Sequence, residues 1–109
     1  MDLWNELCDK LRQLGEAVRA LDRTGKAYAE ARRDYEIAKA KEALKLKDQG
    51  MAVTLIDLVI HGQRDVAMER FKKDVAESTW KANQELVNQC KLEARILESQ
   101  LEREWSLSK

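Results

Sequence analysis

Apolar residues in the first half of the chain recur at alternating intervals of four and three. This heptad-like spacing places them along one face of an amphipathic helix. The stripe consists of Leu7, Leu11, Leu14, Val18 and Leu21, followed by Tyr28, Ala31, Tyr35, Ala38 and Leu44. The pair Thr24-Gly25 is the one point where a kink would cost little, since glycine is a weak helix former. The uninterrupted spacing nevertheless predicts one continuous helix.

The predicted end of this first helix rests on three residues. Lys45 and Lys47 would lie in its last turn, where positive charge is favourable to the helix dipole. Gly50 follows at the position where helices commonly end with a residue in the left-handed conformation, which glycine adopts easily. The sequence therefore predicts a helix over residues 3 to about 49.

Two further helices are predicted after Gly50. Thr54, with Asp57 three residues later, resembles a capping box and predicts a short apolar helix over about 54–61. Asp65 is the predicted N-cap of a third helix over about 65–105. Spacings of three and four continue through this helix, at Met68, Phe71, Val75, Thr79, Ala82, Leu86, Cys90, Ala94, Leu97, Leu101 and Trp105.

These elements predict an all-α fold, in which 1–109 is a single helical domain. Two long helices joined by a short corner should form an antiparallel, coiled-coil-like hairpin, which would bring Trp4 near Trp105. A two-helix hairpin encloses no core, so we expect self-assembly into a homodimer or a higher even oligomer. The expected interface residues are Leu7, Leu11, Leu14, Leu55, Ile56, Val59, Leu97, Leu101 and Trp105.

Composition narrows the possible functions. Twenty basic and twenty acidic residues cancel, and only four glycines and no proline occur among 109 residues. General binding to DNA is therefore not expected, because nucleic-acid-binding domains are usually strongly basic. No apolar run is long enough for a membrane span. The start, Met1-Asp2-Leu3-Trp4, lacks the pattern of a secretory signal, so a reducing cytoplasm and free thiols are expected.

Residues suited to catalysis or metal binding are sparse. The two cysteines and the single histidine, His61, are not clustered, so neither a metal nor a cofactor is expected. His61 could in principle act as a general base. The simpler interpretation is a histidine near a helix C-terminus that interacts with free carbonyl groups. We therefore expect a protein that is not an enzyme.

Basic residues gather in one band of the predicted hairpin. Residues 26–47 hold seven basic and four acidic side chains, whereas residues 93–104 hold two basic and four acidic ones. Arginine and lysine beside aromatic rings could clamp a phosphate and stack a base. The alternative is an ordinary charged helix surface with the aromatic rings in the seam. The candidate anion- or partner-binding residues are Arg32, Tyr35, Lys41, Lys45, Arg70, Lys73 and Trp80.

Several stretches resemble short helical early-gene proteins of phages and prophages of Gram-positive bacteria. They are the runs Lys41–Asp57, Arg70–Glu77, Trp80–Glu85 and Ile96–Trp105. The resemblance covers most of the chain from about Tyr28 to Trp105. None of these runs is a motif with established chemistry, and no catalytic or binding residue carries over.

The resemblance implies a protein that acts in the cytoplasm of a host bacterial cell and binds a component of that host. The first hypothesis is an anti-defence inhibitor of the anti-CRISPR type, or an oligomeric sponge for a nucleotide immune signal. The second is an accessory factor of phage DNA recombination or replication that binds single-stranded DNA or its coating proteins. The third is a coiled-coil adaptor without a ligand. A sequence pI near 6.6 favours the first over general DNA binding.

Overall fold

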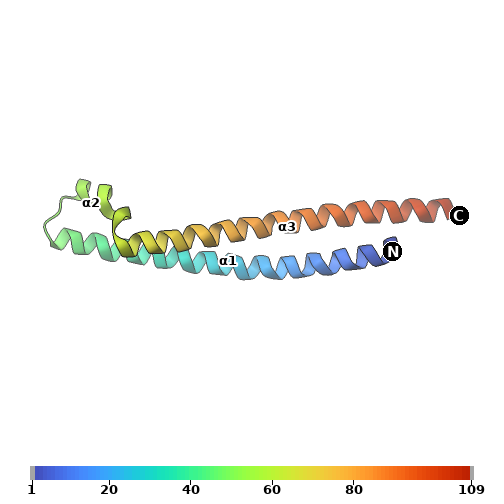
Figure 1. The fold of residues 1–109 in the computed structure, drawn as a ribbon, viewed down its shortest axis with the longest axis horizontal. Coiled ribbons are helices and arrows are strands. Elements are labelled where there is room, and N and C mark those ends of the chain that lie inside the picture. The colour runs from blue at the N-terminus through green and yellow to red at the C-terminus, as the bar shows by residue number, and fades with distance from the viewer. Residues whose placement is uncertain (1, 109) are drawn as a thin grey trace. The chain divides into compact units, whose positions relative to one another are not determined.

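A computed structural model describes residues 2–108 of the chain (Figure 1). It contains the helices α1 (Leu3–Asp48), α2 (Val53–Val59) and α3 (Arg64–Ser108), with a 3₁₀ helix, η1 (Ile60–Gly62), between the last two. The described residues contain no strand. The all-α prediction is confirmed, and the predicted helix limits agree with the structure to within three residues.

The chain divides into two compact units, each built from part of α1 and part of α3. The terminal unit contains the described residues up to Arg23 and those from Trp80 onward, and the corner unit is Thr24–Thr79. The helix α1 continues through Thr24 and Gly25 without a break, as predicted. In the terminal unit Leu3 lies beside Gln100 and Arg103, whereas Lys10 contacts Glu93, so the two helices run antiparallel.

Gly50 ends α1 in the predicted way. Its φ of 89° lies in the left-handed region, which glycine occupies without a steric penalty. The Gly50 N–H donates to the Lys47 carbonyl at 2.9 Å, and the Met51 N–H donates to the Leu46 carbonyl at 3.1 Å. These two bonds form a Schellman motif. The motif turns the chain so that Met51 packs against the core to which Leu46 belongs.

The corner unit encloses a small apolar core. Its buried residues are Tyr35, Leu46, Ile56, Ile60 and Val66, with Ala43, Met51 and Val59 packed against them. The side chain of Val66 is fully buried. Because α2 and η1 contribute Ile56 and Ile60 one helical turn apart, burial of these two residues holds the corner against α1 and α3.

The predicted caps of the two later helices are wrong. The N-cap of α2 is Ala52, without a side-chain hydrogen bond, and Thr54 lies inside the helix. Asp65 lies in the first turn of α3, which begins at Arg64. Burial of Ile56 and Val66, rather than side-chain capping, explains where these helices start.

The buried side of α1, here called its seam, uses heptad positions slightly different from those of the predicted stripe. Leu7 and Ala17 are buried, and Lys10, Leu14 and Leu21 are partly buried. Leu11 and Val18 are instead each 47% exposed. The small side chain of Ala17 lets the helices approach closely, and the methylene chain of Lys10 covers apolar surface while its amine remains polar. The predicted stripe was therefore right at alternate positions up to Leu21. It was right at the four later positions from Tyr28 to Ala38, and wrong at Leu44.

The predicted face of α3 is wrong over its first half. Met68, Phe71, Val75 and Leu86 are between 46% and 69% exposed. The seam consists of Val66, Glu69, Lys73, Ala76, Trp80, Asn83, Val87, Cys90, Ala94, Leu97 and Leu101, which are all buried or partly buried. Alternating steps of three and four connect these positions as well. The first half of α3 therefore carries two rows of residues at heptad spacing, and the more apolar row is the exposed one.

The two terminal tryptophans lie at neighbouring ends of α1 and α3. Leu3, which precedes Trp4, lines one groove with Glu104 and Leu107, which lie on either side of Trp105 in the sequence. Trp4 and Trp105 are 56% and 60% exposed. Direct contact between the two rings stays a prediction.

Two further findings bear on the predictions from composition. No helix within residues 2–108 is long and apolar enough to span a membrane. The thiols of Cys8 and Cys90 are both free, the first exposed and the second buried in the seam.

Candidate functional site

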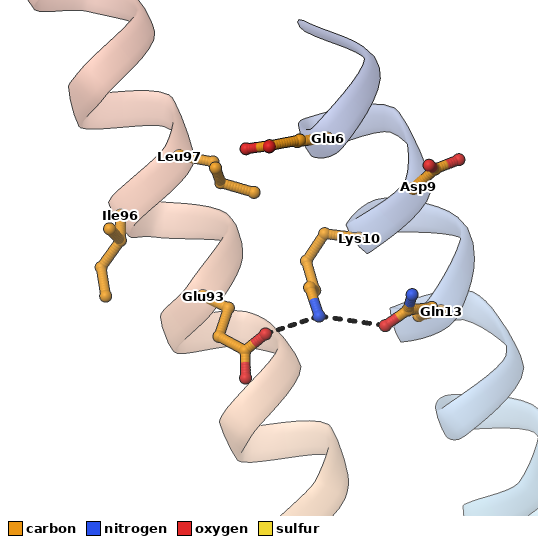
Figure 2. A pocket seen from close by; sticks show the side chains of 7 residues that line it. All are labelled: Glu6, Asp9, Lys10, Gln13, Glu93, Ile96 and Leu97. Atoms are coloured by element: carbon orange, nitrogen blue, oxygen red, sulfur yellow. Dashed lines mark hydrogen bonds and ion pairs between the residues drawn. The ribbon is translucent and has the colours of Figure 1, made fainter. Parts of the chain in front are cut away.

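A groove in the terminal unit combines apolar and charged side chains. It has a volume of about 410 Å³ and is lined by Glu6, Asp9, Lys10, Gln13, Glu93, Ile96 and Leu97. The first four residues come from α1 and the last three from α3 (Figure 2). The side chains of Glu6 and Leu97 extend from the two helices toward each other. The groove therefore offers apolar and acidic surface at the same place.

A network of four polar side chains joins the two walls of this groove. The Lys10 amine donates to Gln13 Oε1 at 3.0 Å and forms an ion pair with Glu93 Oε2 at 2.5 Å (Figure 2). Gln89 Nε2 donates to the other carboxylate oxygen of Glu93 at 2.9 Å. Both oxygens of Glu93 are thus hydrogen-bonded, which fixes the orientation of the carboxylate.

This network shifts two pKa values in opposite directions. The hydrogen bond from Lys10, followed by that from Gln89, lowers the pKa of Glu93 below its ordinary value. The hydrogen bond to Glu93 raises the pKa of Lys10 above its ordinary value. Both side chains therefore remain charged across the neutral pH range.

The remaining lining residues determine what the groove can bind. Ile96 is 49% exposed, and Leu97 is partly buried beside it. Three carboxylates and one ammonium group line the groove, and Asp9 also pairs at 3.2 Å with Arg12, which lies outside the lining. Such a surface suits an apolar side chain flanked by lysine or arginine. It is unfavourable for the phosphates of a nucleotide.

The corner unit contains a second cluster, centred on Tyr35. The Tyr35 hydroxyl and His61 Nε2 are hydrogen-bonded at 2.7 Å, and the two rings are stacked with their centroids 6.2 Å apart. The amines of Lys73 and Lys39 lie 4.8 Å and 5.9 Å from the centre of the Tyr35 ring, within the range of cation–π attraction. His61 therefore contacts a phenol rather than the helix-end carbonyls that the sequence suggested.

The structure brings together only some of the residues that were predicted to bind an anion. Lys73 lies over the ring of Tyr35, but Tyr35 is only 7% exposed, so its ring belongs to the core and leaves little surface for a nucleobase. Lys73 also pairs with Asp74 at 3.5 Å. Trp80 belongs to the terminal unit and is partly buried.

The other basic residues of that band are distributed along the corner unit. Lys41 lines a groove whose other charged residues are Asp34, Glu42, Asp65 and Glu69. Arg32, Lys45 and Arg70 are exposed on the helices. The surroundings of Lys41 are therefore acidic, and anion binding by these residues stays a prediction.

The predicted interface residues divide into buried and exposed groups. Leu7 and Ile56 are buried within the chain, and Leu14, Val59, Leu97 and Leu101 are partly buried. Leu11, Leu55 and Trp105 are between 46% and 60% exposed. Of the predicted interface residues, only this last group is exposed.

Sequence reasoning missed two contacts, Lys10 with Glu93 and Tyr35 with His61. Each contact joins residues far apart in the chain. Which residues of α1 and α3 lie opposite each other depends on the length of the corner between the two helices. A small signal was present, because Lys10 occupies a seam position of the heptad, where a charged residue needs a partner. No family model, curated protein or solved structure matches the chain.

Proposed function

We propose that the chain is a non-enzymatic binding protein that inhibits a bacterial defence protein by docking onto it through the groove of the terminal unit. The observation that carries the proposal is the exposed Ile96 beside Leu97 in a groove lined by three carboxylates. A groove of this kind fits a protein surface that presents an apolar side chain next to basic ones.

The acidic lining favours a protein target over the alternative of a nucleotide sponge. A nucleotide signal carries phosphates, which Glu6, Asp9 and Glu93 would repel. A basic protein surface gains from the same carboxylates. Defence complexes that handle nucleic acid present such basic surfaces, because they neutralise phosphate groups. The anti-defence direction itself comes from the resemblance to phage early-gene proteins.

The test is plaque formation by a sensitive phage on a panel of strains, each with one defence system, with and without this protein. We expect the protein to restore plaques against one system and to bind a purified component of it. Ile96→Lys should abolish both effects, because it places a positive charge where a basic partner would dock. Leu92→Lys is the matched control, since Leu92 is 57% exposed one turn earlier on α3 and does not line the groove.

Two results would contradict this function. One is failure to restore plaques against any system of a broad panel. The other is full protection by Ile96→Lys, which would place the docking surface elsewhere. Circular dichroism of both variants separates loss of docking from loss of folding.

A further inference from the structure

The two long helices carry the same pattern of side chains within the corner unit. In each, an aspartate is followed by an apolar residue after three positions, a lysine after seven and a second apolar residue after ten. On α1 these residues are Asp34, Ile37, Lys41 and Leu44, and on α3 they are Asp65, Met68, Lys72 and Val75. Seven residues make about two helical turns, so each set lies along one side of its helix.

Both sets open onto one face of the corner unit. A groove of about 460 Å³ is lined by Asp34, Ile37 and Lys41 of the first set and by Asp65 and Met68 of the second. Ala38, Glu42 and Glu69, which belong to neither set, complete its lining. We call the surface formed by the eight residues the corner face. Its four apolar side chains are 47%, 62%, 50% and 49% exposed for Ile37, Leu44, Met68 and Val75. Apolar side chains at this spacing on neighbouring antiparallel helices are typical of a helix-bundle interface.

The aspartates and lysines of the corner face are spaced so that they can pair across a two-fold axis. Within the chain, Asp34 also pairs with Arg33 at 3.2 Å and Lys72 with Glu69 at 3.5 Å, and a partner's charges would add to these surface pairs. Because Ile37 and Met68 line the same groove, as do Lys41 and Asp65, each pair lies at about the same level along the helices. Seven residues away in each helix, Asp34 is then level with Lys72. A two-fold axis parallel to the helices would place α1 over α3 of a second copy without changing these levels. Asp34 would face the partner's Lys72, and Lys41 would face the partner's Asp65.

The whole chain exposes more surface than a compact monomer of its mass, which leaves room for an interface of this kind. The chain exposes 8105 Å², whereas a folded monomer of its mass exposes about 6,200 Å². The difference of about 1,900 Å² exceeds the roughly 800 Å² per partner that a stable interface buries. The repeated order of aspartate and lysine on the two helices favours a second copy of the chain as the partner. An unrelated protein would not be expected to carry charges complementary to both helices in the same order.

We propose that the corner face binds the corner face of a second copy of this chain, so that two corner units form a four-helix bundle around a two-fold axis. Ile37 and Met68 lie at the centre of the interface, Leu44 and Val75 lie at its two ends, and the aspartates and lysines set its register. This inference is independent of the proposed function, which uses the terminal unit.

The test uses two charge variants of the full chain. The first is Asp34→Lys with Asp65→Lys, and the second is Lys41→Asp with Lys72→Asp. Each variant alone places like charges opposite each other, so we expect its dimer dissociation constant to rise at least about tenfold in analytical ultracentrifugation at low salt. Mixing the two variants should restore tight association as a heterodimer, which native mass spectrometry identifies by mass.

Two controls accompany the charge variants. Glu16→Lys with Glu98→Lys makes the same change of charge at exposed positions of the terminal unit and should leave the dimer intact. Ile37→Ser with Met68→Ser should weaken the dimer without changing any charge. Circular dichroism should show unchanged helix content in all of these variants.

Three outcomes would overturn the inference. The first is a wild-type chain that is monomeric at micromolar concentration. The second is unchanged association of both charge variants. The third is loss of association that mixing does not restore, which would mean that the charges act within one chain. None of these outcomes bears on plaque restoration, so this inference and the proposed function fail separately.

Discussion

At the residue scale, Gly50 shows how one backbone conformation can contribute to the stability of the fold. It has the only positive φ among residues 2–108, and a methyl group added there would meet nothing within 4 Å. Gly50→Ala should therefore lower the free energy of unfolding by about 1 kcal/mol, through backbone strain alone. Gly62→Ala is the matched control, because that site is equally open but has no positive φ. Chemical denaturation of the two variants measures the difference, and equal stabilities would contradict the Schellman assignment.

The ion pair of Lys10 and Glu93 predicts a dependence of stability on pH. The pKa of Glu93 is lowered in the folded state, so its contribution is present above the ordinary value of 4.5 and is lost as the pH falls through the folded pKa. The pKa of Lys10 is raised, so its contribution is present below 10.5 and is lost as the pH rises through the folded pKa. The pair therefore stabilises the fold throughout the neutral range.

Thermal melting at several pH values tests this dependence. Glu93→Gln should lower the melting temperature slightly at pH 7, and this difference should shrink as the pH falls through the lowered pKa of Glu93. The effect should shrink in 1 M salt, since both side chains are partly exposed and salt screens their attraction. Glu102→Gln, at an exposed position of α3, is the control. A larger loss at pH 3 than at pH 7 would contradict the sign of the shift.

Some single residues were predictable from the sequence and others were not. The role of Gly50 follows from local chemistry, because a glycine after two lysines is a familiar helix end. The bond between Tyr35 and His61 joins residues 26 positions apart, and only the folded corner brings them together. Local rules therefore found the cap and could not find the contact.

At the scale of the element, adjacent residues of α3 test the phase of the seam. Val87 is 5% exposed, whereas Leu86 is 46% exposed. Val87→Ala should lower the free energy of unfolding by about 2 kcal/mol, because it removes two buried methyl groups and leaves a cavity. Leu86→Ala should change it by less than about 0.5 kcal/mol. Urea denaturation of both variants gives the comparison, and the reverse order would restore the stripe expected from the sequence.

The helices themselves were predictable because each long one has an uninterrupted pattern and a glycine just beyond the end that adjoins the corner, Gly50 after α1 and Gly62 before α3. The phase of α3 was not predictable, because Met68, Val75 and Leu86 are more apolar than the seam residues Lys73 and Asn83. Hydrophobicity alone selects the more apolar stripe. Only the packing against α1 shows that small and polar side chains fill the seam while the apolar ones face outward.

At the scale of the whole molecule, the two units differ in what they bury. The core of the corner unit contains one tyrosine, one leucine, two isoleucines and one valine. The buried residues of the terminal unit are Leu7, Ala17, Val87, Cys90 and Ala94, which are smaller on average. Less apolar area is thus removed from water in the terminal unit. We expect its amides to exchange with solvent at least about tenfold faster than those around Leu46, Ile60 and Val66.

Hydrogen exchange followed by mass spectrometry, on the wild type and on Val66→Ala, tests whether the units open separately. Val66 is fully buried in the corner core, so its truncation should cost about 2 kcal/mol and lower protection there by about thirtyfold. If each unit opens on its own, protection of the terminal unit stays the same, because none of its contacts is removed. We expect this separation, since the contacts of the chain fall into two groups. An equal loss of protection in both units would show instead that they unfold together, with the uninterrupted helices α1 and α3 transmitting the loss from one to the other.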